Sequence, residues 1–450
     1  MRKHRFDLAV IGTGSAASTV ASRCRGAGWS VAVIDELPPG GTCALRGCDP
    51  KKILVGAAEA VDAARRLAGK GLREGGLGID WAELMRFKRS MIGGYSARKE
   101  ESFRRAGIEL FRGHARFADP STLVTGSDRI EATAIVIASG ARPAPLGIPG
   151  EEHLTTSTEF LELDALPRRI AFVGGGFISF ELAHVAARAG AEVTILHRGP
   201  HPLPLFDREL ADLLAERSRA LGIDVRVGTL VTRIQRAGDR LVVTARGGGE
   251  DLRVEADLVV HGAGRVPAVD DLDLAAGEVE IAGRRIVLNE FLQSVSNPAV
   301  RAAGDAAAAG PALTPVAGYD GQIVAANLLE GNHRRPDYEV VPSVVFTIPP
   351  LASVGLREED ARSRDIPFRT SLIDTSSWYS SRRVGETHSA AKVLVEEGTD
   401  RILGAHLLGP AAEETINLFA MAMRAGTTAP QLRQMLFAYP THASDVAYML

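Results

Sequence analysis

The feature that most constrains this chain is a strand–glycine turn–helix unit that occurs twice. The apolar run at 6–11 precedes the turn Gly12-Thr-Gly14-Ser-Ala-Ala17 and an Ala-rich helical segment. The run at 169–173 precedes Gly174-Gly-Gly176-Phe-Ile-Ser179 and a second helical segment, 180–189. Each pattern predicts a buried strand, a tight turn and a helix, repeated after about 160 positions. The sequence therefore predicts a duplicated α/β architecture.

The first turn has the residues that dinucleotide binding requires. Gly12 permits the tight turn, Gly14 lets the backbone approach a pyrophosphate, and Ala17 keeps helix and strand close. The predicted strand at 31–34 ends in Asp35-Glu36, where Asp35 is placed to bind the two ribose hydroxyls. A short glycine motif alone also arises by chance. Here the strand before it, the helix after it and the acid at the end of the second strand all support dinucleotide binding.

The second turn has no acid at the corresponding strand end. Leu196 is followed by His197-Arg198 and then His201. Because NADP sites use Arg for the 2′-phosphate, Arg198 favours NADPH over NADH, with His197 or His201 assisting. The alternative is a solvated loop arginine. Ser179 stands where Gly or Ala is usual and should still permit close packing.

Two cysteines lie five positions apart, at Cys43 and Cys48. Pro50 predicts a loop carrying Cys43 that runs into a helix beginning near Cys48. A thiolate there would lie at the positive end of the helix dipole beside Arg46 and Lys51, and both effects lower a cysteine pKa. A pair of structural thiols or two metal ligands are the alternatives.

Composition narrows the class of protein. The 450 residues predict two to four domains, and the net charge of -3 gives no reason to expect nucleic acid or an acidic membrane surface. Three cysteines exclude a secreted disulfide scaffold, and Cys24 is predicted to be a core residue. The N-terminal apolar run is too short for a signal peptide and no run is long enough to span a membrane, so we expect a soluble cytoplasmic protein.

The stretch Gly40-Gly-Thr-Cys-Ala-Leu-Arg-Gly-Cys-Asp-Pro-Lys51 resembles the active-site sequence of the class I flavoprotein pyridine nucleotide-disulfide oxidoreductases. This family includes glutathione reductase, dihydrolipoamide dehydrogenase and mercuric reductase. Further segments resemble family motifs in the same order, at 135–143, 258–267, 301–305, 313–317 and 344–355. Ala268 replaces an Asn after the second of these, and Gln322 stands where the family commonly has Gly-Arg.

The resemblance implies an α/β fold with two Rossmann-type domains and a C-terminal α+β dimerisation domain. The implied boundaries are 1–148 and 268–337 for the two parts of the FAD domain, 149–267 for the NAD(P)H domain and 338–450 for dimerisation. FAD would contact Gly12, Gly14, Ser15, Ala17, Asp35, Glu36, Gly41, Thr42, Ala115, Ser139, Gly140, Gly304, Asp305, Leu313, Thr314 and Ala317. The pyridine nucleotide would contact Gly174, Gly176, Ile178, Arg198 and Gly264.

The resemblance also implies the catalytic roles. Cys48 would be the flavin-side thiol, able to form a charge-transfer thiolate, and Cys43 the outer thiol that attacks the substrate disulfide. Lys51 and Glu181 match the family's ion pair beside flavin N5 and the nicotinamide. A cation there stabilises the anionic reduced flavin.

The C-terminal segment departs from the family pattern. The family uses a His and a Glu there to protonate the leaving thiolate across the dimer, and this chain has Tyr439 and Ser444. A phenol is a poor proton shuttle at neutral pH. Two alternatives stay open. Either His442, oriented by Asp445, donates the proton, or Tyr439 acts on a different substrate.

Taken together, we expect a homodimeric FAD enzyme that passes electrons from NADPH through Cys43 and Cys48 to a small-molecule or protein disulfide. No resident metal site is expected. A metal-ion or quinone reductase that uses Tyr439 is the alternative, although the cysteines that mercuric reductases carry near the C-terminus are missing after Cys48. A non-catalytic flavoprotein is disfavoured because Cys43, Cys48, Lys51 and Glu181 are all present.

Overall fold

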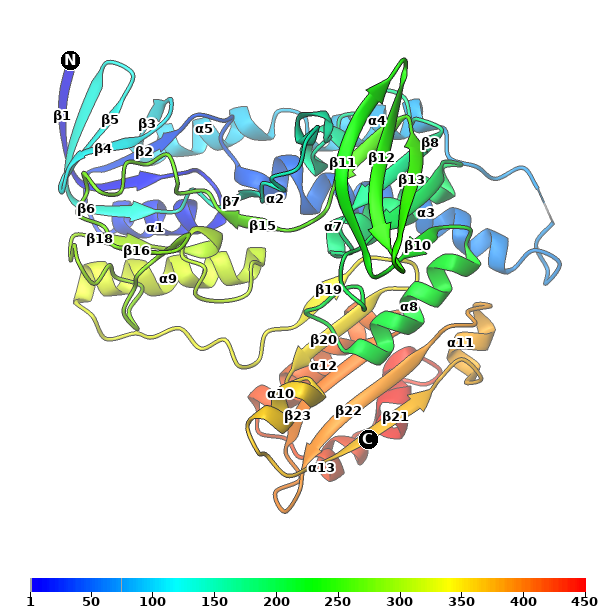
Figure 1. The fold of residues 1–450 in the computed structure, drawn as a ribbon. Helices are drawn as coiled ribbons and strands as arrows, with labels where there is room; N and C mark the ends of the chain where they lie inside the picture. Colours follow the sequence, from blue (N-terminus) through cyan, green and yellow to red (C-terminus); the bar gives the residue numbers. More distant parts are fainter. Residues whose placement is uncertain (1, 74) are drawn as a thin grey trace. The chain divides into compact units, whose positions relative to one another are not determined.

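The computed structural model describes residues 2–73 and 75–450, which fall into two compact units (Figure 1). Unit 1 contains Met1–Pro50, Arg89–Ala144 and Arg265–Tyr338, and unit 2 contains Lys51–Lys88, Pro145–Gly264 and Glu339–Leu450. The four domain boundaries given above stay a prediction. Among the described residues, none of the helices combines the length and apolar character that a membrane-crossing segment needs.

Unit 1 is built on a mixed sheet in the order β3-β2-β1-β6-β5-β4, with β18 beside the C-terminal half of β6. Its strands are β1 (Arg2–Ile11), β2 (Val31–Asp35), β3 (Glu109–Arg112), β4 (Arg116–Asp119), β5 (Thr122–Thr125), β6 (Asp128–Ile137) and β18 (Val300–Ala302). The strand expected at 6–11 is present but begins at Arg2. Its last four residues are buried, as expected for parallel strands covered on both faces.

Helices α1 (Ser15–Gly26) and α9 (Thr314–Glu330) lie side by side against this sheet (Figure 1). Cys24 is fully buried between them and the sheet, as predicted. The linking strands β7 (Ala141–Pro143) and β15 (Arg265–Pro267) pair with each other. Smaller elements of unit 1 are α5 (Tyr95–Ala106), β16 (Ile281–Ala282), β17 (Arg285–Ile286) and the 3-10 turn η2 (Gly304–Ala306).

The cysteine segment folds differently from the prediction. Cys43 lies in a short helix, α2 (Gly41–Arg46), where a loop was expected. The next helix, α3 (Cys48–Arg66), begins at Cys48 as predicted. The chain turns sharply into α2 because Gly40 and Gly41 have φ of +135° and +74°, a backbone conformation that glycine adopts readily. Downstream, α4 (Trp81–Ile92) is separated from α5 by Gly93-Gly94, a break that the sequence did not suggest.

Unit 2 contains a parallel sheet in the order β10-β9-β8-β14. Its strands are β8 (Arg169–Val173), β9 (Glu192–Leu196), β10 (Asp224–Arg226) and β14 (Leu258–His261). Helices α7 (Phe177–Arg188) and α8 (Arg208–Ala220) belong to it. Helix α7 begins three residues earlier than expected, because the turn ends at Gly176. The remaining elements are η1 (Glu151–His153), α6 (Ser157–Phe160), β11 (Thr229–Ala237), β12 (Arg240–Gly247) and β13 (Glu250–Ala256).

The C-terminal part of unit 2 is an antiparallel sheet in the order β19-β20-β23-β22-β21. Its strands are β19 (Ser343–Val345), β20 (Leu351–Gly355), β21 (Phe368–Asp374), β22 (Ala390–Glu396) and β23 (Ile402–Leu408). The helices are α10 (Glu358–Ser363), α11 (Tyr379–Arg383), α12 (Ala412–Arg424), α13 (Ala429–Arg433), η3 (His442–Asp445) and α14 (Val446–Met449). The strands expected near 344, 392 and 402 and the helix near 413 are present.

Candidate active site

The two cysteines lie in a small polar cluster of unit 1. Neither cysteine forms a disulfide in this structure. The sulfur of Cys48 lies 3.5 Å from Oγ1 of Thr314, the first residue of α9, and the sulfur of Cys43 lies 4.0 Å from Oδ1 of Asp49. The fold therefore brings Thr314, far along the chain, to the first residue of α3.

The pKa of the Cys43 thiol is raised in the folded chain. A hydrogen bond to Cys48 and burial both raise the pKa of the Cys43 thiol, and the nearby charge of Asp49 acts in the same direction. The sequence reasoning concerned a thiolate near Cys48, at the start of α3, and the lowered pKa expected there stays a prediction. A thiol that is partly buried and hydrogen-bonded to a second thiol loses its proton less readily than a thiol in water.

The first glycine turn fits a pyrophosphate. Gly12 has a φ of +110°, and any Cβ there would clash with the carbonyl of Ala138. A Cβ on Gly41 would lie 2.5 Å from the Cα of Gly14, so two backbones meet without room for side chains. Helix α1 begins after Gly14 with no side chain capping its first N–H groups. Uncapped amides at a helix N-terminus bind anions.

Asp35 lies at the end of β2, as predicted, and already has two partners. It accepts hydrogen bonds from Thr13 Oγ1 at 2.6 Å and from the backbone N–H of Leu37 at 2.9 Å. These bonds hold the carboxylate at the strand end, and the side chain stays partly exposed. Thr13 is a residue that the sequence reasoning missed, although it lies inside the glycine motif.

The second part of the predicted FAD site centres on Gly304 and Asp305. The N–H of Gly304 donates to Oδ2 of Asp320 at 3.0 Å, and Tyr338 donates its hydroxyl to Oδ1 of the same carboxylate at 2.7 Å. Burial raises the pKa of Asp305 and of Asp320. The sequence reasoning missed Asp320 and Tyr338, because neither belongs to a family motif.

The other predicted FAD contacts are distributed around this sheet. Ser139 donates to the carbonyl of Ala268 at 2.7 Å, and Gly140 accepts from the N–H of Ala268 at 2.9 Å. Ala115 is buried in the core. The remaining residues are Ser15 and Ala17 in α1, Glu36 after β2, Thr42 in α2, Leu313 before α9 and Ala317 within α9. The uncapped helix, the glycine cradle and these hydrogen-bonding groups fit FAD.

Lys51 and Glu181 form a nearly buried ion pair in unit 2. Lys51 Nζ lies 2.9 Å from Oε1 of Glu181, whose side chain is only 4% exposed. The backbone N–H of Phe346 donates to the same oxygen at 2.8 Å, and Lys51 Nζ also lies 4.4 Å from the centre of the Phe346 ring. A buried pair is maintained only with such additional contacts. The role of Phe346 was not evident from the sequence.

The second glycine turn resembles the first in its backbone. Gly174 has a φ of +102°, and a Cβ there would clash with the carbonyl of Gly262. Helix α7 follows Gly176 with no side-chain cap, which leaves its first amides for an anion. Ile178 lies in the first turn of α7, and Gly264 follows β14. These groups fit the pyrophosphate of a dinucleotide.

The histidines after β9 have hydrogen-bond partners within the protein. His197 accepts a hydrogen bond from the N–H of Gly175 at Nδ1, 3.0 Å away, and donates from Nε2 to the carbonyl of His201 at 2.8 Å. Burial lowers the pKa of His197, with a further contribution from Arg198. His201 pairs with Asp212 at 2.9 Å. Both imidazoles therefore have partners within the protein, and Arg198 beside them is exposed.

At the C-terminus, Tyr439 is 82% exposed, and His442 is half-buried in η3. Burial and the charge of Arg383 lower the pKa of His442, which keeps this imidazole neutral. Asp445, its expected orienter, accepts a hydrogen bond from Ser380. The two residues line the same small cavity, of about 30 Å³.

Family models match nearly the whole chain. The model described as pyridine nucleotide-disulphide oxidoreductase matches residues 6–321, and the model of the dimerisation domain of the same family matches residues 341–449.

Individual proteins agree with this match. The chain is 33% identical to a glutathione reductase of Burkholderia cepacia over 99% of this chain and 98% of that protein. It is 32% identical to a mercuric reductase of Staphylococcus aureus, over 98% of this chain and 81% of that protein. Among solved structures, the Cu(II) complex of the HOCl-induced flavoprotein disulfide reductase RclA from Escherichia coli superposes with a TM-score of 0.88, at 28% identity, covering 99% of both chains.

Proposed function

Because the chain belongs to the pyridine nucleotide-disulphide oxidoreductase family, we propose that it is a homodimeric enzyme that uses NADPH to reduce a disulfide through FAD and the couple formed by Cys43 and Cys48. The family establishes a flavin-dependent oxidoreductase that uses a pyridine nucleotide and carries a dimerisation domain. NADPH, the homodimer and the acceptor are the parts that we propose. The observation that carries the proposal is the contact between the two thiols, supported by Thr314.

Two glycine turns would hold the two cofactors. The turn at Gly12 with Asp35 and Asp305 would hold FAD, and the turn at Gly174 would hold the nucleotide, with Arg198 on its 2′-phosphate. FAD held at these residues would supply a two-electron path from the pyridine nucleotide to the cysteine disulfide. Lys51, fixed by Glu181, supplies the positive charge that this chemistry requires.

The two thiols carry out the half of the reaction that reduces the substrate disulfide. The Cys43 sulfur attacks one sulfur of the substrate disulfide, which forms a mixed disulfide and releases one substrate thiolate. The Cys48 sulfur then attacks Cys43, releases the second thiolate and restores the cysteine disulfide. The two protons of the cysteine thiols pass to the two products. The raised pKa of Cys43 means that a base must take its proton before the attack, and Cys48 is such a base only when it is itself a thiolate.

A metal ion is the second candidate acceptor. Tyr439 occupies the position of the family's proton-donating His and is exposed, and reduction of a metal ion needs no thiolate leaving group to be protonated. Relatives named mercuric reductase and a Cu(II) complex of RclA are among the similar proteins. The same electron path through Cys43 and Cys48 would serve either acceptor.

An acceptor panel tests the proposal. The purified protein, reduced anaerobically with NADPH, should take up four electrons and expose two titratable thiols. Glutathione disulfide, lipoamide, Hg(II), Cu(II) and a quinone are then compared as acceptors with the native enzyme and with Cys43→Ser. Loss of about 10²-fold or more of the best activity in Cys43→Ser supports the thiol path, and Cys24→Ser is the matched control.

Full activity of Cys43→Ser with every acceptor would overturn the thiol path. Tyr439→His separates the two acceptors: it should raise disulfide reduction, since general acid help is worth about 10²–10⁴-fold, and leave metal reduction unchanged. His442→Gln tests the remaining proton donor in the same assay.

A further inference from the structure

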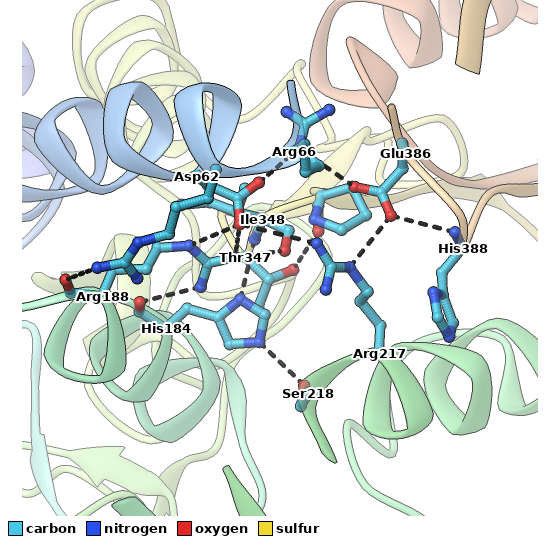
Figure 2. A network of polar contacts seen from close by, with 12 residues as sticks. Asp62, Arg66, His184, Arg188, Arg217, Ser218, Thr347, Ile348, Glu386 and His388 are labelled. Carbon is cyan, nitrogen blue, oxygen red and sulfur yellow. Dashed lines mark hydrogen bonds and ion pairs between the residues drawn. The ribbon is translucent and has the colours of Figure 1, made fainter. Parts of the chain in front are cut away.

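Four arginines meet in a cavity of unit 2 that the proposed function does not use. The arginine cavity, of about 200 Å³, is lined chiefly by Arg65, Arg66, Arg188, Arg217 and Asp62. Figure 2 shows most of this cluster, with the guanidinium groups arranged around the carboxylate of Asp62. The residues come from α3, α7 and α8, at or near the last turn of each helix.

Helix capping explains part of this arrangement. Arg65 donates to the carbonyl of Arg188 at 3.4 Å, Arg66 donates to the carbonyl of Val384, and Arg188 donates to the carbonyl of His184 at 3.1 Å. Cations near helix C-termini are stabilising because they face the negative end of the dipole. This effect accounts for one arginine at each helix end and not for four around one cavity.

The positive charge of the cluster exceeds the negative charge. Asp62 accepts from Arg66 and Arg188 at 2.7 Å each and lies 3.7 Å from Arg217, and Glu386 accepts from Arg217 at 3.1 Å. Two carboxylates thus face four guanidinium groups. The pKa of His184 is held well below its usual value by burial and by the charges of Arg188 and Arg217, so this imidazole is neutral and adds no charge.

Some N–H donors of the cavity are unused. In the described part of the chain, Nη2 of Arg66 and Nη1 of Arg217 form no hydrogen bond. Neither nitrogen is among the fully buried polar atoms that lack a partner. Arg65 is exposed at the rim. Three arginines that line the cavity therefore have N–H groups without an acceptor among the described residues.

We propose that the arginine cavity binds a phosphate-class oxyanion, either inorganic phosphate or the phosphate of a small monoester. Arginine forks match tetrahedral oxyanions in geometry and keep their charge at every physiological pH. The volume is many times the roughly 10–15 Å³ of the same measure that a cavity needs to hold one water, so a phosphate group fits with room for waters or a small organic substituent. This inference is independent of the redox function proposed above.

Calorimetric titration of the FAD-loaded enzyme, without pyridine nucleotide and at constant ionic strength, tests the proposal. Inorganic phosphate and phenyl phosphate are the two probes. Arg65→Ala should weaken binding about three- to tenfold, since Arg65 is exposed and contributes one screened contact. Arg65→Lys should recover part of the loss. Tighter binding of phenyl phosphate identifies an organic phosphate as the ligand, and equal binding identifies the free ion.

Two further variants locate the site. Arg236→Ala, an exposed arginine of β11 away from the cavity, is the matched control and should leave binding unchanged. Arg198→Ala tests whether the anion binds at the predicted nucleotide site instead. The proposal is wrong if phosphate does not bind at millimolar concentration, or if Arg198→Ala abolishes binding while Arg65→Ala has no effect. Anomalous diffraction from crystals soaked in tungstate would place the anion directly.

Discussion

The turn at Gly12 and the turn at Gly174 have nearly the same backbone, with φ of +110° and +102° after a buried strand. In both, a neighbouring carbonyl excludes a Cβ, and the helix that follows has no side-chain cap. The side chains around them differ. The first turn has Asp35 held by Thr13, and the second has His197 held by Gly175 with Arg198 beside it.

This difference teaches how one backbone unit serves two ligands. The glycines create an anion site that any dinucleotide can use, and the residue at the end of the second strand selects among dinucleotides. The helix residue that faces the strand also differs, because the position of Ala17 in the first unit is occupied by Ser179 in the second. The buried hydroxyl of Ser179 has no hydrogen-bond partner in the described structure. Each difference can be tested by exchanging residues between the two turns.

The largest effect is expected from Gly12→Ala and Gly174→Ala. Each substitution places a Cβ against a backbone carbonyl at positive φ, which costs about 1–3 kcal/mol in backbone strain and a similar amount in overpacking. Gly12→Ala should yield colourless protein, whereas Gly174→Ala should retain FAD and lose reduction by NADPH. Flavin absorbance and stopped-flow reduction measure the two outcomes.

Gly26→Ala is the matched control for both, because its φ is ordinary and nothing lies near the added carbon. If Gly174→Ala loses FAD and Gly12→Ala does not, the assignment of the two turns is reversed.

The next effect concerns nucleotide choice. Arg198→Glu should lower kcat/KM for NADPH about 10- to 100-fold, because a hydrogen bond to a charged group contributes about 1.5–3 kcal/mol. The value for NADH should stay the same or rise. Steady-state kinetics with both nucleotides provide the measurement, with Arg236→Glu as the control. Equal losses for both nucleotides would contradict a role in 2′-phosphate binding.

A smaller effect is expected from exchanging the helix residues. Ser179→Ala should stabilise the protein by about 1 kcal/mol, since it removes a buried hydroxyl without a partner. Ala17→Ser should destabilise it by a similar amount, because Ala17 is fully buried against β1. Urea unfolding followed by fluorescence measures both. A destabilised Ser179→Ala would show that the hydroxyl has a partner.

The smallest effect is a pH dependence of stability that comes from His197 in the second turn and has no counterpart in the first. The folded protein lowers the pKa of His197 below 6.5, so the unfolded chain binds more protons there in mildly acidic solution. Stability contributed by neutral His197 is therefore complete above pH 6.5 and falls as the pH decreases below it. His197→Asn retains an acceptor for the Gly175 N–H and should lose less stability between pH 7.5 and 5.5 than the native protein. An identical decrease in both proteins would contradict this role of His197.

The sequence predicted most of the elements because their signals are local. Buried strands read as apolar runs, and Gly12 and Gly174 mark turns that only glycine can make. It failed at Cys43, where a loop was expected and α2 forms. It also missed Asp320, Phe346 and the donors around Asp62, whose partners lie far along the chain.

The sequence by itself determined the family, the two glycine turns and the cysteine pair, because steric limits at glycine and residue spacing act within a few positions. Tertiary structure decided the charge states and the partners. The pKa of Cys43 is raised because folding places Cys48 against it and removes water. Burial also keeps His197 neutral, because it lowers the pKa of the imidazole by more than the hydrogen bond with the His201 carbonyl raises it.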